Sequence, residues 1–598
     1  MNFNINDRKI SINKQNIIIF SLVLFFALHF LYFTEVYMIN FPYAYDTTSL
    51  RIFINESEFL GENFTIMNYI ENLFTDTNGR AIIFPKLLVL PNYLLNNFDS
   101  TNIFYLNFVI LATTLLTIFL MLRENSKKLY WTLIPISALI FSPLINNNYW
   151  NYTILIWYLP ALCIVASIYF LNKKHNFKNI TLVLLLSIVS TYSIPLGLVI
   201  WASGTTVMLK KYIRKSIWKQ KIPIFYFSSM IFIGIIYYTG NIGTQNIISF
   251  DEFFSIQTVY VFLTFLAVPF KLKYDILMMI AGIASVSIAG FLVYYLGLVR
   301  KQFKEIFPWM LFFIVSITAA ILMRIGRFDP YFEGNLPYYS PISEYFQIGI
   351  IILVAILIYE IKRDNFLKNK KTMLFFLYSI IIIQMIFLIP SYYNGWWKGD
   401  YYYDQKTEYI NCYSLHQDWS VTCENSYNVS LDSKETYYLK FIIYNYLLKN
   451  NYNIFSNPDF NKNTIKELND FNKKIDENTN MKKIEGHISR VNNFELSEKY
   501  FLNEDQSLII SGVISTDNIK EIEVMYLMID GTPFAKFNDF YDSESTTGSN
   551  QLTNEIKWTF ALLKSYLPEG CKQVSFMGMK NNEPFVLNDE TEICNIPN

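Results

Sequence analysis

Long apolar runs in the first 390 residues constrain this chain more than any other feature. A helix needs about 20 mostly apolar residues to cross hydrocarbon. Runs of this kind cover 16–37, 101–122, 130–147, 152–172, 222–240, 275–298, 306–324, 346–362 and 372–390. The run 179–209 is too long for one span and is interrupted at 190–197 (STYSIPLG), which predicts two short spans. The sequence therefore predicts an α-helical polytopic membrane protein with about eleven spans.

Composition divides the chain into a membrane part and a water-exposed part. Only 16% of the 598 residues are charged, against about a quarter in soluble proteins, and the deficit lies in residues 1–390. Residues 391–483 read as an aromatic and helical connector. Residues 484–598 alternate with period two at 507–513, 519–529, 532–537 and 573–578, and Asp530-Gly531 signals a hairpin turn. We expect a β-sandwich-like domain there.

Basic clusters predict the orientation of the spans. They lie at 8–9, 123–128, 173–178, 210–221, 300–304 and 362–371, and such clusters remain cytoplasmic. The N-terminus is then cytoplasmic and the C-terminal domain extracytoplasmic, in a multi-pass protein of the plasma membrane. Counting the apolar segment 254–270 as a crossing would put a basic cluster on the wrong side. We therefore expect it to lie in the outer interface as an interfacial helix or to re-enter it.

Cysteine placement supports the same orientation. Four of the five cysteines, Cys412, Cys423, Cys571 and Cys594, fall in the tail. Nearness in sequence favours the disulfides Cys412–Cys423 and Cys571–Cys594, which persist only in an oxidising compartment. The alternative is four buried free thiols. No C-x-x-C spacing indicates a metal site.

Polar residues in the predicted outer loops are the candidates for chemistry. Asp46 closes the string 41–46 (FPYAYD) directly after the first span, and Asp76 and Arg80 lie further along the same loop, 38–100. Arg324 and Arg327 leave the outer end of a helix together, against the positive-inside rule. Guanidinium groups match phosphate oxygens in bidentate geometry, so a lipid phosphate is the expected partner.

Each candidate also has a purely structural interpretation. Asp46 could cap the following helical stretch, and Asp76 and Arg80 could pair with each other on the surface. Arg324 and Arg327 could anchor phospholipid headgroups or pair with Asp329 and Glu333. Trp396 and Trp397 could belong to an interfacial aromatic belt or stack on sugar rings.

The layout resembles the C-type (GT-C) polytopic membrane glycosyltransferases across the membrane part of the chain. A first span, a long outer loop with an early Asp, many short loops and a C-terminal outer domain carry the resemblance. Strings at 78–88 (NGRAIIFPKLL), 190–201 and 324–343 resemble a poorly characterised bacterial group with this layout. The usual paired acidic motif is absent, because Thr47 follows Asp46, and without D-x-D spacing no metal cofactor is predicted.

The resemblance implies transfer of a sugar from a polyprenyl-phosphate carrier to an extracytoplasmic glycan or lipid acceptor. Asp46 matches the catalytic base, and Arg327 with Arg324 or Arg80 would stabilise the departing lipid phosphate. Asp76, Tyr339, Trp396 and Trp397 are the candidate substrate-binding residues. We expect Asp46 and Arg327 within roughly 10 Å of each other in a concave pocket. The alternatives are a non-catalytic envelope assembly protein and a flippase of lipid-linked glycan; nucleic acid is not an expected partner at zero net charge.

Overall fold

The computed structural model has two compact units, Met1–Tyr403 and Asp404–Asn598. The residues that it describes are 2–5, 8–11, 14–38, 82–88, 101–125, 127–143, 152–173, 176–212, 220–240, 255–272, 274–325, 340–363, 369–416 and a set of strands between 482 and 595. Several predicted site residues of the outer loops lie outside the described residues: Asp46, Asp76, Arg80, Arg327 and Tyr339. Cys423 also lies outside them.

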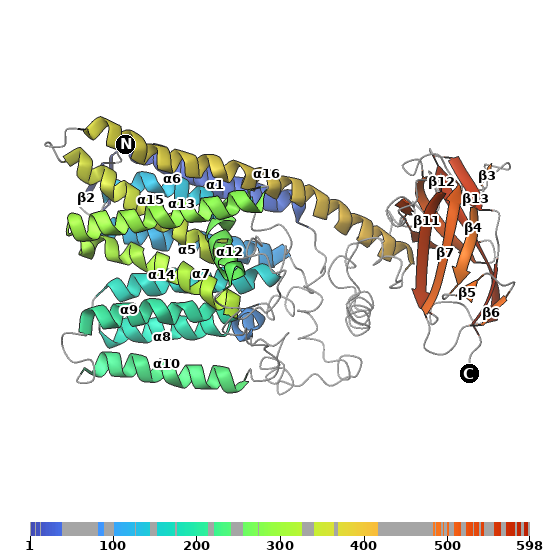
Figure 1. Ribbon diagram of the computed structural model, residues 1–598, viewed down its shortest axis with the longest axis horizontal. Helices are drawn as coiled ribbons and strands as arrows, with labels where there is room; N and C mark the ends of the chain where they lie inside the picture. The colour runs from blue at the N-terminus through green and yellow to red at the C-terminus, as the bar shows by residue number, and fades with distance from the viewer. Residues whose placement is uncertain are drawn as a thin grey trace. The chain divides into compact units, whose positions relative to one another are not determined.

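The first unit is a helical bundle (Figure 1). Its longer helices are α1 (Lys14–Tyr37), α5 (Thr101–Asn125), α7 (Tyr152–Asn172), α10 (Lys221–Gly240), α13 (Asp275–Val293), α14 (Phe303–Ile325), α15 (Ser340–Arg363) and α16 (Lys370–His416). Its shorter elements are η1 (Lys127–Thr132), α6 (Leu133–Ile140), α8 (Phe177–Thr191), η3 (Pro195–Leu198), α9 (Val199–Tyr212), α12 (Ile256–Ala267), η6 (Val268–Phe270) and η7 (Tyr294–Val299). The strands β1 (Asn2–Ile5) and β2 (Arg8–Ser11) precede α1 as an antiparallel pair.

Among the described residues, seven helices are long and apolar enough to cross a membrane, which confirms the multi-pass character of the chain. They are the segments Lys14–Tyr37, Thr101–Glu124, Leu155–Asn172, Asp275–Val299, Phe303–Arg324, Ser340–Arg363 and Lys370–Gly399. Four further apolar helices are shorter, so the expected count of about eleven spans stays a prediction. Large apolar side chains such as Phe25, Phe232 and Phe375 are exposed on the helices, as lipid contact requires.

Helix α15 forms the centre of the bundle. Residues 340–358 are all buried, and Tyr359, which follows them, is part-buried. Helix α15 packs against α14, α13, α12, α7 and α6. The Tyr345 hydroxyl donates to the Ala161 carbonyl of α7 at 2.6 Å, and the Ser316 hydroxyl of α14 donates to the Ile342 carbonyl at 2.9 Å. These bonds fix the first two turns of α15 between its neighbours.

The interruption predicted at 190–197 is a tight turn between α8 and α9. The Ser190 hydroxyl donates to the Gly197 carbonyl at 3.1 Å, and the Trp201 indole N–H donates to the Thr191 hydroxyl at 2.9 Å. A Cβ at Gly197 would lie 1.8 Å from the Ser190 carbonyl oxygen. The turn therefore requires glycine at this position, because the two backbones approach too closely for any side chain.

The segment expected to lie in the outer interface or to re-enter it is a short helix. Helix α12 has 12 residues and continues into η6, and Phe265 to Val268 are fully buried with Phe270 only 2% exposed. It packs against α13, α14 and α15. Only the C-terminal half of the segment is buried, because Ile256 near its start is 84% exposed. Both alternatives for this segment therefore stay predictions.

The C-terminal end of this segment receives hydrogen bonds from three donors on other helices. The Gln347 amide donates to the Leu266 carbonyl at 2.8 Å, the Ser391 hydroxyl to the Pro269 carbonyl at 2.6 Å and the Asn394 amide to the Lys271 carbonyl at 3.3 Å. A helix end leaves carbonyls without partners in its own helix. In a dry bundle such groups need protein donors, which α15 and α16 supply.

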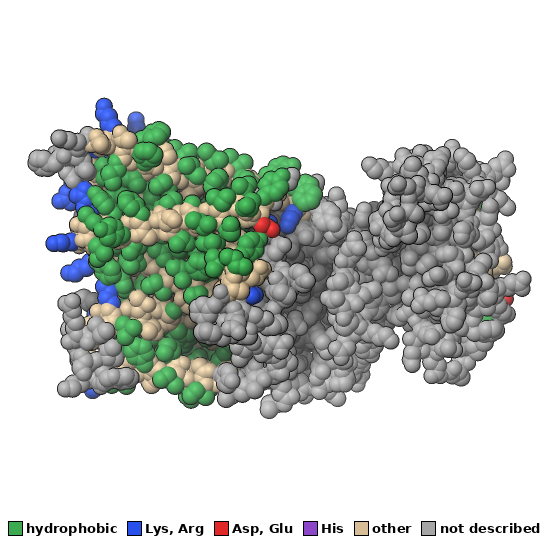
Figure 2. Space-filling model, in the orientation of Figure 1, with side chains coloured by type: hydrophobic (Ala, Val, Ile, Leu, Met, Phe, Trp, Pro, Cys, Tyr) green, Lys and Arg blue, Asp and Glu red, His purple; other side chains and the backbone are tan. Residues whose placement is uncertain are grey.

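Lys and Arg side chains gather at one end of the bundle, which we call the basic end (Figure 2). The residues at the helix ends there are Lys14, Arg123, Lys173, Lys210, Lys211, Lys221, Arg300, Lys301, Lys304, Lys362, Arg363, Lys370 and Lys371. All of them except Lys14 belong to the clusters from which the orientation was predicted. The helices alternate in direction, so that the ends of α8 and α14 and the start of α15 lie at the opposite end (Figure 1).

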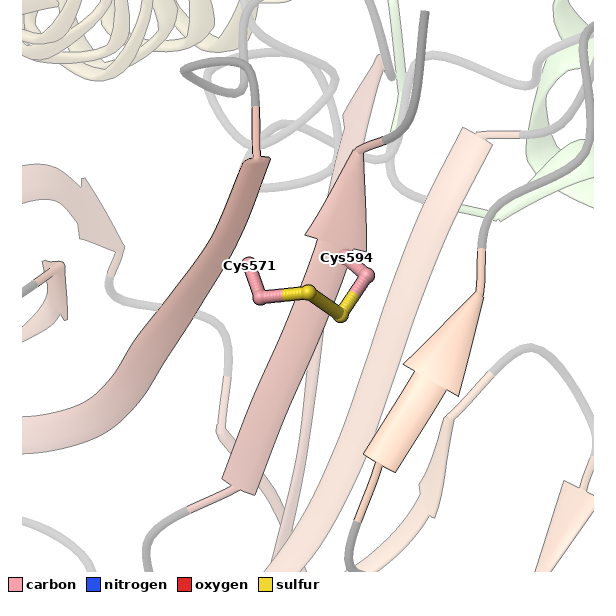
Figure 3. The surroundings of a disulfide bond; sticks show 2 residues. All are labelled: Cys571 and Cys594. Atoms are coloured by element: carbon pink, nitrogen blue, oxygen red, sulfur yellow. A yellow bond between two sulfur atoms is a disulfide. The ribbon is translucent and has the colours of Figure 1, made fainter.

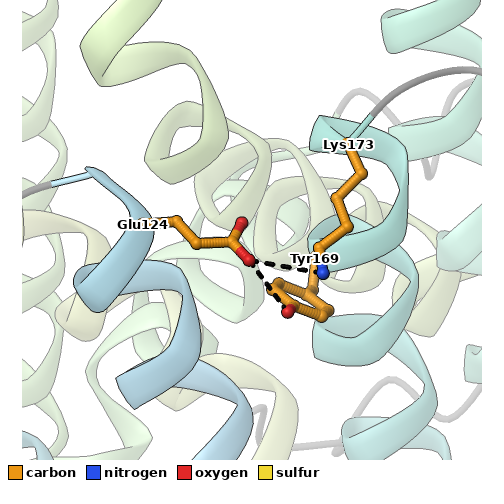
Figure 4. A network of polar contacts seen from close by, with 3 residues as sticks. All are labelled: Glu124, Tyr169 and Lys173. Atoms are coloured by element: carbon orange, nitrogen blue, oxygen red, sulfur yellow. Dashed lines mark hydrogen bonds and ion pairs between the residues drawn. The ribbon is translucent and has the colours of Figure 1, made fainter. Parts of the chain in front are cut away.

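A polar contact joins α5 and α7 at the basic end (Figure 4). The Tyr169 hydroxyl donates to the Glu124 carboxylate at 3.0 Å, and the Lys173 ammonium lies 3.3 Å from the same oxygen and 4.1 Å from the centre of the Tyr169 ring. Hydrogen bonding to Tyr169, and then the Glu124 carboxylate, raise the pKa of Lys173. The charge of Lys173 is therefore kept at the membrane surface.

The second unit contains two sheets. One has the order β10-β11-β7-β4-β5; the other has β3-β13-β12-β14-β6, with β8 beside β12 and β9 beside β8. The strands are β3 (Lys482–Ile484), β4 (Gly486–Val491), β5 (Phe494–Glu495), β6 (Lys499–Phe501), β7 (Ser507–Ser515), β8 (Ile522–Ile529), β9 (Thr532–Phe537), β10 (Phe540–Asp542), β11 (Glu555–Leu563), β12 (Gly570–Lys580), β13 (Glu583–Leu587) and β14 (Thr591–Asn595). All four segments predicted as strands are strands. Ile529 pairs with Thr532 across β8 and β9, as the Asp530-Gly531 signal predicts.

The predicted disulfide Cys571–Cys594 is present (Figure 3). The two cysteines face each other on the antiparallel strands β12 and β14. Glu592 lies close enough to the two cysteines for the three side chains to hold a metal ion. Because the two sulfur atoms are bonded to each other, we interpret the pair as a structural crosslink. The second predicted disulfide, Cys412–Cys423, stays a prediction.

Candidate functional site

Three charged side chains are buried among the described residues: Lys86, Arg324 and Glu344. All three lie at the end of the bundle opposite the basic end. Arg324 is in the last turn of α14, Glu344 is in the first turns of α15, and the turn that carries Lys86 bonds to the α8–α9 turn. Buried charge at membrane depth is expensive and marks functional sites. This end of the bundle is therefore the candidate site.

Arg324 is held against the first turn of α12. It is only 5% exposed, and its Nε donates to the Thr258 hydroxyl at 3.1 Å. The Ser255 side chain caps the same turn by accepting from the Thr258 backbone N–H. Arg324 therefore lies beside a helix N-terminus, where the backbone dipoles already carry partial positive charge.

One nitrogen of this guanidinium lacks a partner. Arg324 Nη1 is buried and makes no hydrogen bond within the part of the chain that the structure describes. A buried unpaired cation is costly, because its desolvation is not offset. Two positive features at one place, a guanidinium and a helix N-terminus, suit an anion such as phosphate.

Glu344 was not among the predicted site residues, because the span was expected to begin at 346. Helix α15 begins at Ser340 instead, which places Glu344 inside the helix, where it is 3% exposed. The Ser340 hydroxyl donates to Glu344 Oε1 at 2.8 Å. An acidic residue directly before a long apolar run was the available signal. Among the described residues, no cation forms an ion pair with Glu344.

Tyr158 of α7 is a buried polar residue that was also missed. Its side chain is fully buried, and its hydroxyl makes no hydrogen bond to any described residue. Nothing in the sequence separates Tyr158 from the other tyrosines in apolar runs, because its distinction comes only from packing.

Lys86 lies in a helical turn, 83–88, that packs against the α8–α9 turn. The Phe84 backbone N–H donates to the Tyr192 carbonyl at 3.3 Å. Lys86 is fully buried. The string 83–88 was noted for its resemblance, but burial of the lysine follows from docking on a distant turn, which the local sequence does not encode.

The two tryptophans predicted to bind substrate have different surroundings. Trp396 packs against α1, where its indole N–H donates to His29 Nε2 at 3.1 Å and its ring contacts Phe33 and Tyr37. Trp397 is 56% exposed. Of this pair, Trp397 is the more exposed, as either an interfacial belt or sugar stacking requires.

Comparison of the chain with protein-family models, with curated proteins and with solved structures finds no match. The chemistry of the site is therefore argued from its side chains.

Proposed function

We propose that the chain is a membrane glycosyltransferase that moves a sugar from a polyprenyl-phosphate carrier to an extracytoplasmic acceptor in cell-envelope glycan assembly. The observation that carries the proposal is Arg324, a buried guanidinium at the N-terminus of α12 whose Nη1 bonds to no residue that the structure describes. This pairing suits a phosphate at the level of the lipid headgroups.

The orientation in this proposal follows from charge. The basic end faces the cytoplasm by the positive-inside rule, so that Arg324 and Glu344 lie at the extracytoplasmic end. The Cys571–Cys594 disulfide supports an oxidising compartment for the tail. We infer further that four shorter elements, η1 with α6, α8, α9 and α10, complete about eleven spans without α12, and that the two sheets pack as a sandwich.

The reaction would be a single displacement. Asp46 takes the proton of an acceptor hydroxyl, the oxygen attacks the anomeric carbon, and the bond from that carbon to the phosphate oxygen breaks. The electron pair stays on the lipid phosphate, whose growing charge Arg324 and the α12 N-terminus stabilise, with Arg327 as a second guanidinium. Arg324 would therefore contact phosphate before and after transfer.

The first test measures phosphate binding by the full-length protein in detergent. Farnesyl phosphate should raise the Tm of the wild type and farnesol should not, because only the first carries an anion. At 100 times its Kd a ligand adds about 2.7 kcal/mol of stability. Arg324→Gln should abolish this increase. Arg363→Gln, at the exposed end of α15, is the matched control and should keep it.

The second test measures transfer. Surface glycans of a deletion strain, analysed by mass spectrometry, should lack a sugar that the wild-type gene restores and that Arg324→Gln and Asp46→Asn do not. Restoration by both variants would remove these residues from the mechanism. Phosphate binding without any change in surface glycans would favour the assembly or flippase alternatives.

A further inference from the structure

Two lysines lie at the end of the bundle opposite the basic end, where the positive-inside rule does not predict them. Lys398 is at the end of the 30-residue apolar segment Lys370–Gly399. A helix of that length extends about 45 Å, from the headgroups of one leaflet to those of the other. Lys271 shortly precedes the apolar segment Asp275–Val299, which Arg300 follows at the basic end. Both lysines are therefore at headgroup level.

Hydrogen bonds hold Lys271 against α16. The Asn394 amide donates to the Lys271 carbonyl at 3.3 Å, and the Ser391 hydroxyl donates to the Pro269 carbonyl at 2.6 Å. Lys398 follows Asn394 by one helical turn, so their Cβ atoms lie about 5–6 Å apart on one face of α16. Lys271 is thereby fixed beside the turn that carries Lys398. The flexible stems of the two lysines allow both ammonium groups to reach one phosphate.

Exposed aromatic side chains give the same depth as the helix lengths. Tyr274, Tyr393 and Trp397 are all more than half exposed, and Trp397 is next to Lys398 in sequence. Tyrosine and tryptophan gather where the bilayer meets water. Lys271 and Lys398 are part-buried and not enclosed, so that a lipid headgroup can reach them without a cavity.

The described charges leave this surface positive. Asp275 lies close to Lys271 in sequence, in the first turn of α13, where the helix dipole already favours a carboxylate. One carboxylate against two ammonium groups leaves a net positive charge. The surface is also distinct from the Arg324 site, because Arg324 contacts the first turn of α12, whereas Lys271 follows its C-terminal end.

We propose that Lys271 and Lys398 bind the headgroup phosphate of an anionic phospholipid in the leaflet at this end of the bundle. A phosphatidylglycerol headgroup has a net negative charge that matches two ammonium groups. The choline of phosphatidylcholine cancels the charge of its phosphate and would itself meet two cations. This site goes beyond the proposed function, which assigns the carrier phosphate to Arg324.

The experiment uses the full-length protein in nanodiscs that contain equal amounts of phosphatidylglycerol and phosphatidylcholine. Either lipid carries a photoactivatable group near its headgroup, and mass spectrometry identifies the crosslinked peptides. In the wild type, phosphatidylglycerol should crosslink to residues 391–399 at least about fivefold more than phosphatidylcholine, because each lysine near the surface contributes about that factor. Lys271→Gln with Lys398→Gln should remove this preference. Replacement of both lysines by Arg should keep it, because the charge is kept.

The matched control is Lys14→Gln with Lys371→Gln, two exposed lysines at the basic end. This control should keep the preference at 391–399. Equal crosslinking of the two lipids in the wild type would overturn the proposal, and this comparison does not depend on the folding of any variant. A preference kept by the double Gln variant of Lys271 and Lys398 would also overturn it.

The response to farnesyl phosphate separates this proposal from the proposed function. The double Gln variant of Lys271 and Lys398 should keep the Tm increase that farnesyl phosphate causes, because the Arg324 site is unchanged. Loss of that increase in this variant would assign the two lysines to the carrier phosphate and overturn the phospholipid proposal. A wild type that prefers phosphatidylglycerol at 391–399 but shows no response to farnesyl phosphate would overturn the proposed function alone.

Discussion

At the residue scale, the turn between α8 and α9 depends on a single missing side chain. Gly197 approaches the Ser190 carbonyl so closely that a Cβ would lie 1.8 Å from its oxygen. By contrast, a Cβ at Gly234, in the middle of α10, would meet nothing within 4 Å. Gly197 lies in the 3-10 turn η3 and Gly234 inside the α-helix α10, so the two glycines make a contrasting pair.

Gly197→Ala should destabilise the protein, because one of the two backbones must move to admit the methyl group. Overpacking of this kind costs about 1–3 kcal/mol, which the Tm of the purified protein in detergent measures. Gly234→Ala should be neutral or stabilising by up to about 1 kcal/mol, because alanine favours the helix. Equal behaviour of the two variants would contradict the geometry at Gly197.

The candidate site was predictable in part at this scale. The arginine at 324 stands out in the sequence because it breaks the positive-inside rule, and its burial beside α12 gives that anomaly a physical meaning. Glu344 and Lys86 were visible as charges, but their burial depends on where α15 begins and on how 83–88 docks. Tyr158 could not be predicted, because an unpartnered hydroxyl is a property of packing.

At the element scale, apolar length predicts helices well and their ends poorly. The expected span 346–362 is the helix Ser340–Arg363, because Ser340 and Glu344 bond to each other within the first turns. The expected span 130–147 begins with the 3-10 helix η1 and continues in α6, of only 8 residues. Hydropathy indicates which residues are apolar. It says little about where a helix begins or where a 3-10 helix changes to an α-helix.

The C-terminal end of α12 depends on a hydrogen bond from Gln347, and loss of this side chain should lower the free energy of unfolding. Gln347 is fully buried; it donates to the Leu266 carbonyl and the Ser285 hydroxyl and accepts from Gln384. Gln347→Leu would leave these partners unpaired, and we expect a loss of about 2–3 kcal/mol in unfolding free energy.

Reversible unfolding in mixed micelles measures this loss. Ser379→Ala is the control, because among the described residues the Ser379 hydroxyl bonds to the Phe375 carbonyl of its own helix alone. Its effect should stay within about 0.5 kcal/mol. A Gln347→Leu variant as stable as this control would show that the carbonyls of α12 do not need their donor.

At the scale of the whole molecule, two independent features bear on the predicted orientation of the chain across the membrane. The basic end collects the lysines and arginines of the connections between helices (Figure 2), and the disulfide lies in the second unit. The two features are independent of each other, because one depends on charge and the other on redox chemistry. The strands of the second unit were predictable because their alternation is local; the order of the strands in the sheets was not.

Labelling of intact cells tests this topology. In a variant with Cys412 and Cys423 replaced by Ser, an impermeant reductant followed by an impermeant maleimide should label the exposed Cys571 without lysis. The buried Cys163 should stay unlabelled. With both tail cysteines also replaced by Ser, Lys371→Cys, which is exposed at the basic end, should be labelled only after lysis. The reverse pattern would invert the orientation.

The capping of α12 also has a consequence for how the chain enters the bilayer during synthesis. The donors to its last carbonyls, Gln347, Ser391 and Asn394, are made later than α12 itself. Until α15 and α16 have been made, the carbonyls of Leu266, Pro269 and Lys271 lack these donors. We therefore expect the C-terminal end of this segment to reach its final place only after the two later helices have joined the bundle.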